Sequence, residues 1–160
     1  MTLPTLGAFL AEQYRAELEA FRAALDAVPD EQFGVATLSH SPAWHALHIG
    51  EWLRVTVLED RTPTFHHLGW EDREWVRSLG TAPAPLSETA SKADILGQLD
   101  DIGARAVATL EAATETQLGG MVPSPSAPSG ERPRLPALGQ HLRHIAYHRG
   151  QVQLGKKGSR

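Results

Sequence analysis

Residues 41–54 read SPAWHALHIGEWLR and residues 136–155 read PALGQHLRHIAYHRGQVQLG, and these two segments are the most informative about the fold. The first opens with serine and proline, a pair that predicts a helix start because serine caps free N–H groups and proline suits the first helical position. In both stretches apolar residues then recur every three or four positions, as in an amphipathic helix. We expect the helix that begins at Ser41 to end near Asp60, and the helix that begins near Pro136 to stop at Gly155.

Two more helices are predicted, one before and one after the helix that begins at Ser41. Residues 6–25 carry apolar side chains at three- and four-residue steps, with charged residues on the other faces. Ser91 and Asp94 form a variant of the capping box, and the helical pattern that follows them fades after Ala113. Residues 114–135, with SPSAPSG at their centre, have no apolar period and are expected to form a mobile loop.

The length of the connections predicts how the helices are arranged. Residues 61–90 form a far longer connection than adjacent antiparallel helices need, so they can carry the chain back along the bundle. In chain order, the second helix (41–60) and the third helix (91–113) would then be parallel, and the second and the fourth (136–155) antiparallel. Within this crossover GWEDREWVRSLG (69–80) suits a short helix. The sequence therefore predicts an all-α four-helix bundle that forms a single domain over residues 1–160.

Composition excludes several classes of function. A net charge of −4 and a pI near 6.0 offer no field for nucleic acid. No stretch approaches the roughly 20 apolar residues of a membrane span, and the N-terminus lacks a signal-peptide pattern, so we expect a cytoplasmic protein. The chain has no cysteine, so any thiol chemistry needs an external thiol and any metal site needs nitrogen or oxygen ligands.

Six of the eight histidines fall in two windows, HSPAWHALH (40–48) and HLRHIAYH (141–148). On a helix His144 and His148 lie one turn apart on one face and can bind one ion, with His48 as a third ligand. His48 lies about 9 Å from the start of its helix, and the His144/His148 pair about 12 Å from the end of theirs, so antiparallel helices bring them to similar heights. The pocket would open at the end that carries the 28–40 connection, away from the Pro/Ser loop.

Spacing alone leaves other interpretations open. A pair of histidines one turn apart on an amphipathic helix is more often solvent-facing or hydrogen-bonded in the core than bound to a metal ion. Alternatively, His45 or His141 could be a ligand in a shifted register. Otherwise these two border the pocket, His40 lines its mouth, and His66 and His67 are surface residues. The candidates for contact with the ligands or the substrate are Trp44, His45, Glu51, His141 and Gln151.

The two windows also resemble a known family. HIAYHRGQV (144–152), preceded by Gln140 and His141, is similar to the last-helix signature of the DinB/YfiT-like metalloenzymes, and SPAWHALHIGEWLR is similar to their second helix. In that family three histidines on the second and fourth helices bind a metal ion, which implies His48, His144 and His148 here. The family bundle has parallel second and third helices, as the crossover length also predicts.

The resemblance implies a function as well as a fold. The superfamily includes bacillithiol- and mycothiol-dependent S-transferases and isomerases, so we expect a metal-dependent enzyme that activates a low-molecular-weight thiol with zinc or nickel. Two alternatives stay open: a hydrolase that activates water, and a non-enzymatic metal-binding stress-response bundle. The expected partner is a small-molecule substrate, and relatives commonly form homodimers. The sequence assigns no catalytic residue beyond the metal ligands.

Overall fold

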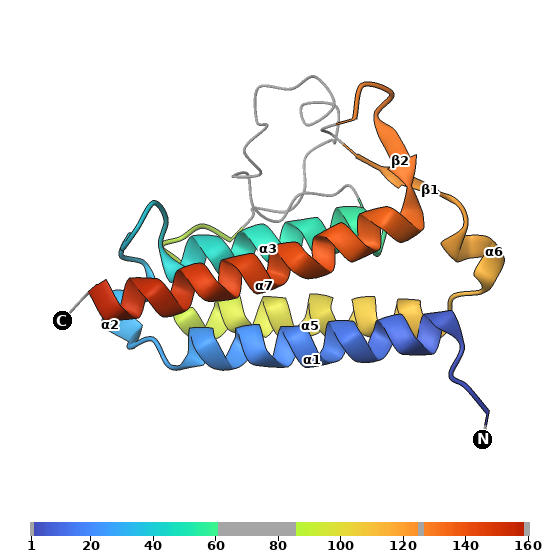
Figure 1. Ribbon diagram of the computed structural model, residues 1–160. Helices are drawn as coiled ribbons and strands as arrows, with labels where there is room; N and C mark the ends of the chain where they lie inside the picture. The colour runs from blue at the N-terminus through green and yellow to red at the C-terminus, as the bar shows by residue number, and fades with distance from the viewer. Residues whose placement is uncertain (1, 61–85, 125–126, 159–160) are drawn as a thin grey trace.

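The protein is described by a computed structural model that covers residues 2–60, 86–124 and 127–158. Four long helices form a bundle (Figure 1), and they are α1 (Leu6–Asp26), α3 (Pro42–Thr56), α5 (Lys92–Glu111) and α7 (Arg134–Gly158). Two short helices, α2 (Asp30–Phe33) and α6 (Glu115–Leu118), follow α1 and α5, and a hairpin of β1 (Met121–Pro123) and β2 (Glu131–Pro133) precedes α7. The predicted all-α four-helix bundle is confirmed.

The helices run in the predicted directions. In Figure 1, α3 and α5 run the same way along the bundle, while α7 runs against α3. The hydroxyl of Ser41, at the start of α3, donates to the carboxylate of Glu88 just before α5 at 2.7 Å, so both helices begin at the same end. Of the crossover, residues 61–85 lie outside the described residues, and with them His66, His67 and the short helix expected at 69–80.

Side-chain caps fix three of the long helices at their N-termini. The Ser41 hydroxyl accepts from the Trp44 N–H at 3.0 Å, and the Ser91 hydroxyl accepts from the Asp94 N–H at 3.1 Å. Thr5 does the same for α1. Each cap satisfies a backbone donor that the helix itself cannot, and contributes about 1 kcal/mol. The helix starts predicted at Ser41 and Ser91 are therefore confirmed.

Two helix ends differ from the prediction. Helix α3 ends at Thr56, before Asp60, whose N–H turns back to the Arg54 carbonyl at 2.8 Å. Helix α7 continues past Gly155 to Gly158. Gly155 is buried, and a Cβ at this position would collide with the side chain of Thr37. This glycine therefore permits a close approach of the chain before α3, and it does not stop the helix.

The segment 114–135, expected to be a loop, contains a short helix and two short strands, so the prediction of a loop without regular structure was wrong. Thr114 and Gln117 form a reciprocal capping box that starts α6. Val122 of β1 then pairs with Arg132 of β2, and Gly130 makes the turn with a φ of +76°. Strands of three residues are too short to show an alternating pattern, so no periodicity predicts this hairpin.

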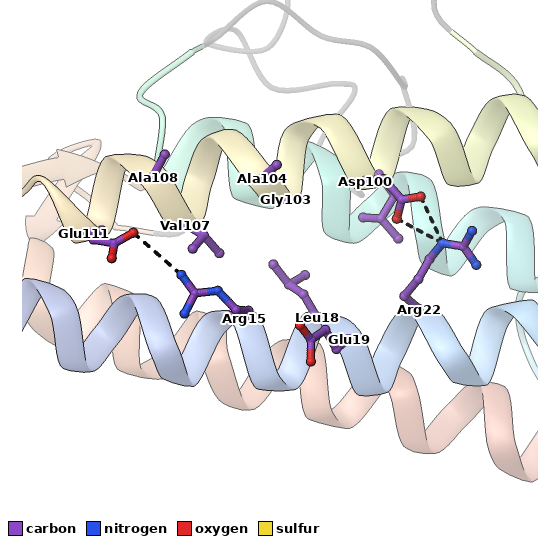
Figure 2. Close-up of a pocket in the computed structure, with 11 residues that line it drawn as sticks. Arg15, Leu18, Glu19, Arg22, Asp100, Gly103, Ala104, Val107, Ala108 and Glu111 are labelled. Atoms are coloured by element: carbon purple, nitrogen blue, oxygen red, sulfur yellow. Dashed lines mark hydrogen bonds and ion pairs between the residues drawn. The ribbon is translucent and has the colours of Figure 1, made fainter.

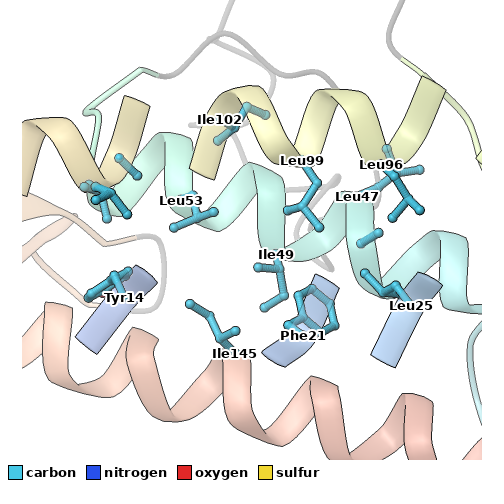
Figure 3. Close-up of a cluster of buried hydrophobic side chains, with 14 of the residues drawn as sticks. Tyr14, Phe21, Leu25, Leu47, Ile49, Leu53, Leu96, Leu99, Ile102 and Ile145 are labelled. Atoms are coloured by element: carbon cyan, nitrogen blue, oxygen red, sulfur yellow. The ribbon is translucent and has the colours of Figure 1, made fainter. Parts of the chain in front are cut away.

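The core lies between the four long helices (Figure 3). Tyr14 and Phe21 of α1 and Ile49 of α3 are fully buried. Every residue of α3 is buried, so its histidines, Glu51 and Arg54 lie in the interior together with its apolar side chains. A helix surrounded in this way brings polar groups to the centre of the bundle, where they need partners. Among the described residues, no helix combines the length and apolar character that crossing a membrane requires.

Candidate metal centre

Three histidine side chains from two facing helices, α3 and α7, meet where these helices pack against each other. The Nε2 atom of His144 lies 2.8 Å from Nε2 of His148, its neighbour one turn along α7, and 3.2 Å from Nε2 of His48 on α3. One ring nitrogen from each of the three lies within 4.8 Å of the others, so the group could hold a metal ion. The structure thus brings together the three histidines that the sequence singled out, here called the triad.

The donor set of the triad fits a divalent ion. Metal–nitrogen bonds of 2.0–2.1 Å place neighbouring nitrogens about 3.3 Å apart in a tetrahedral site and about 2.9 Å apart in an octahedral one. The two Nε2 distances of 2.8 and 3.2 Å lie close to these values. Without a cation between them, three converging lone pairs repel unless hydrogens are shared among them. Imidazole nitrogen suits zinc and nickel equally.

Burial prepares two of these histidines for metal binding. Removal from water lowers the pKa of His144, and it lowers the pKa of His148 to about 2 with the help of the neighbouring histidines, first among them His48. Both rings therefore stay neutral at ordinary pH. The neutral ring is the form that offers a lone pair, so no proton has to be displaced when a metal ion binds.

Two of the predicted neighbours contact the triad directly. The Nδ1 atom of His45 lies 2.8 Å from Nδ1 of His148, so when His148 uses Nε2 as a ligand its Nδ1–H donates to His45. Burial, with His40 nearby, lowers the pKa of His45 to about 4 and keeps it neutral enough to accept. The Trp44 indole stacks between His48 at 4.3 Å and His40 at 3.6 Å, measured between ring centroids. Both contacts restrict how the histidine rings can turn.

A cavity of about 550 Å³ adjoins the triad. Among the described residues, its lining consists of His48, Trp52, Arg132, Gln140, His141, Arg143 and His144. Because Arg132 belongs to β2, the cavity lies on the side of the hairpin, and the prediction that the pocket opens at the opposite end was wrong. On that opposite side the space beside the triad is filled by His40, Trp44 and His45. His40, expected at the mouth, does not line the cavity.

The remaining sequence candidates occupy different positions. His141 is buried and lines the cavity, and its Nδ1 lies 3.2 Å from the hydroxyl oxygen of Tyr14. Burial, followed by His144, His48 and Arg132, places the pKa of His141 well below its usual value. Burial also raises the pKa of Tyr14, which keeps its phenol protonated. Glu51 is buried in α3 and Gln151 is half-buried in α7, and neither lines the cavity.

Sequence reasoning missed four residues near the triad. Arg132, Gln140 and Arg143 line the cavity, and the Arg132 guanidinium donates to the side-chain oxygen of Gln140. Tyr14 was read only as an apolar position of the first helix. A weak signal existed in ERPR (131–134), two arginines just before the histidine-bearing helix. Only the hairpin, which the sequence did not reveal, shows that one of them reaches the cavity.

A second cavity, of about 500 Å³, lies between α1 and α5 (Figure 2). Its walls combine apolar side chains such as Val107 with charged groups that pair with one another. Arg22 contacts Asp100 at 2.9 Å and Arg15 contacts Glu111 at 3.6 Å. No histidine lines this cavity within the part of the chain that the structure describes. The triad and the chemistry that it suggests are therefore confined to the α3/α7 side.

A helical bundle with three imidazoles on facing helices and a cavity beside them defines a metal-binding type of bundle protein. A comparison with protein families agrees, because the sequence model of the DinB superfamily matches residues 13–152. The match covers most of the chain, and the protein belongs to the DinB superfamily. A comparison with curated proteins found no significant match.

Proposed function

We propose that the protein is a metal-dependent S-transferase that activates a low-molecular-weight thiol of the bacillithiol or mycothiol type. The observation that carries the proposal is the position of the triad, because His48 and His144 are at once part of the possible metal site and part of the wall of a cavity of about 550 Å³. A cavity of this size holds a small molecule. The chain has no cysteine, so the sulfur has to come from such a molecule.

Each side chain near the triad has a definite task in this proposal. His48, His144 and His148 would hold the ion, zinc or nickel, which when bound lowers the pKa of a thiol by several units. His45 accepts a hydrogen bond from His148 and so fixes which nitrogen of that ring faces the triad. Trp52 gives the cavity an apolar wall that keeps water from the reacting groups.

The reaction balances without any redox partner. The thiol loses its proton to solvent, and its sulfur forms a bond to an electrophilic carbon of the second substrate. The bond from that carbon to the leaving group breaks, and the leaving group departs with the electron pair. The chain contributes by holding both reactants in one cavity, which converts a bimolecular encounter into a reaction between bound neighbours.

The surroundings of the triad favour catalysis over a structural ion. A structural site is closed by a fourth protein ligand, whereas a catalytic site keeps a position open. Within the described residues the possible metal-binding group contains three histidines, and the cavity reaches two of them. This arrangement supports a site with an open coordination position. An open position would also suit a hydrolase that activates water, which is the alternative that the test below distinguishes.

The test is a conjugation assay on protein loaded with zinc or nickel. The protein is incubated with bacillithiol, mycothiol, glutathione or coenzyme A and with the chromogenic electrophile 1-chloro-2,4-dinitrobenzene. We expect metal-dependent conjugation with one of the thiols, and its loss in the His144→Ala variant. Absence of metal-dependent conjugation with every thiol, together with metal-dependent cleavage of nitrophenyl esters, would replace this proposal by a hydrolase.

A further inference from the structure

His141 is fixed in one tautomer by a chain of hydrogen bonds behind the cavity. The Tyr14 hydroxyl has one proton, which it donates to the Leu138 carbonyl at 2.8 Å. The same oxygen lies 3.2 Å from Nδ1 of His141. Both contacts contain a hydrogen only if His141 carries its proton on Nδ1 and donates it to the Tyr14 oxygen, since the opposite tautomer would set two lone pairs against each other.

This tautomer leaves a buried acceptor in the wall of the cavity. With the proton on Nδ1, the lone pair of His141 is on Nε2, and that atom is buried with no hydrogen-bond partner. The residue is only 3% exposed, and it is one of the residues that line the cavity. A buried acceptor without a donor is costly for a folded protein and is rare unless a ligand satisfies it. The cavity therefore has a place for an N–H or O–H group.

The same cavity also presents two guanidinium groups. Arg132 is held in place by its hydrogen bond to Gln140, and its Nε is buried without a partner. Neither Arg132 nor Arg143 forms an ion pair with a carboxylate of the described residues, and the described lining residues include no aspartate or glutamate. In the second cavity, by contrast, both arginines are paired with carboxylates. The cavity beside the triad thus has positive charge available for an anion.

We propose that Arg132, Arg143 and His141 form a substrate subsite that selects a small organic carboxylate with an N–H or O–H donor. The two guanidinium groups bind the carboxylate, whose flat pair of oxygens matches their donors. The Nε2 atom of His141 accepts the donor of the same molecule. The subsite deepens the proposed function, on which it rests in taking the cavity to hold a substrate, and these residues position that substrate without being metal ligands.

A pair of matched probes tests the subsite. N-acetylglycine carries a carboxylate and an N–H, while acetoxyacetate has the same shape with an ester oxygen in place of the N–H. Binding of each to the full chain is followed by nuclear magnetic resonance titration, with and without zinc, so that binding of the carboxylate to the metal ion is measured separately. We expect N-acetylglycine to bind the metal-free protein about 10-fold more tightly than acetoxyacetate, as one lost hydrogen bond predicts.

Three variants assign the effect to residues. Arg132→Met should weaken both probes about 10-fold or more, whereas Arg15→Met in the second cavity should weaken neither. Tyr14→Phe releases the tautomer of His141 and should reduce the preference for N-acetylglycine. Long-range proton–nitrogen spectra of the unmodified protein should show the His141 proton on Nδ1, a readout that does not depend on binding.

The outcomes separate this inference from the proposed function. Equal binding of the two probes, or a proton on Nε2 of His141, would overturn the role of His141. Unchanged binding of both probes in Arg132→Met would overturn the anion subsite. Neither result touches metal binding by the triad or the conjugation assay. Conversely, a protein that shows the expected probe preference but no metal-dependent reaction would retain the subsite and lose the S-transferase.

Discussion

The cavity beside the triad and the cavity between α1 and α5 are similar in volume, about 550 and about 500 Å³, but opposite in chemistry. Between α1 and α5 the arginines are matched by carboxylates of the other helix. Beside the triad, Arg132 has a buried nitrogen without a partner, and so has His141. The volume of a cavity is therefore a weak indicator of function, whereas buried polar groups without partners in its wall are a strong one.

The reason for the difference is energetic. An ion pair near the surface is complete without a ligand and contributes little to stability. A buried donor or acceptor without a partner costs about 1–3 kcal/mol, a cost that a bound ligand removes. A bundle that keeps three converging imidazoles beside one cavity, and buried nitrogens of His141 and Arg132 without partners, therefore has lower stability there than an apolar core would give. The free energy is recovered when a metal ion and a substrate bind.

The largest effect is expected from removing one member of the triad. His144→Ala should abolish stoichiometric metal binding, a larger loss than the roughly 10- to 100-fold that removal of an outer hydrogen-bond partner causes. The measurement is elemental analysis of the purified protein together with a chelator competition. His66→Ala, which changes a histidine outside the triad, serves as control. Full metal occupancy in His144→Ala would rule out the triad as the metal site.

A change of pH should affect the metal-free protein through its buried histidines. Unfolded histidine has a pKa of about 6.5, whereas the pKa of His45 in the folded protein is about 4. Below pH 6.5 the unfolded chain takes up a proton that the folded chain refuses, so the free energy of unfolding falls as the pH falls. At about 1.4 kcal/mol for each pKa unit, His45 alone accounts for a loss of about 3 kcal/mol between pH 6.5 and pH 4.

Urea denaturation at a series of pH values measures this dependence. The His45→Gln variant lacks the titrating group and should lose less stability over the same interval. Identical pH dependence in the two proteins would contradict the assignment to His45.

Removing the hydrogen bond between His45 and His148 should lower the metal affinity without abolishing metal binding. His45→Phe removes the acceptor for the Nδ1–H of His148 while it keeps an aromatic ring beside Trp44. Metal affinity should fall about 10- to 100-fold, as is usual when an outer hydrogen-bond partner of a ligand is lost. His40→Phe, which keeps only a ring stack on Trp44, is the matched control, and equal losses in the two variants would argue against the hydrogen bond.

The smallest effect is expected on the α1/α5 side. Arg22 pairs with Asp100 at 2.9 Å and with Asp26 at 3.2 Å, and its side chain is one-third exposed. Arg22→Met should lower the free energy of unfolding by less than about 1 kcal/mol and leave metal affinity unchanged. Arg132→Met removes a cation that has no carboxylate partner among the described residues, and it should cost no more stability than Arg22→Met when the two variants are compared by thermal denaturation. A large loss of stability in Arg132→Met would show that Arg132 already makes stabilising contacts within the protein and does not need an anion as a partner.

Local signals in the sequence predicted much of this protein. Ser41 and Ser91 cap the helices that they were expected to start, because a hydroxyl one residue before a helix satisfies a free backbone N–H wherever the helix lies. The length of the crossover predicted that α3 and α5 are parallel. The spacing of His144 and His148, with the resemblance at His48, singled out the histidines whose Nε2 atoms converge.

Predictions failed where the outcome depended on contacts between distant segments. Gly155 looked like a helix stop, yet it lies inside α7 because the chain near Thr37 packs against it. The segment from 114 to 135 looked like a loop, yet it forms a hairpin that brings Arg132 to the cavity. The cavity was expected on the wrong side of the triad, because helix heights alone do not show which side is filled by Trp44 and its neighbours.

The helices, their order and the His144/His148 pair could be predicted from the chain alone, since periodicity, capping and i, i+4 spacing are properties of neighbouring residues. Which nitrogens converge, which side of the triad is open and which polar atoms lack partners followed only from the folded arrangement. These depend on where side chains from α1, α3, α7 and the hairpin meet, and the hydrogen bond from His141 to Tyr14, 127 residues away, is the clearest case. No local pattern encodes a contact of that span.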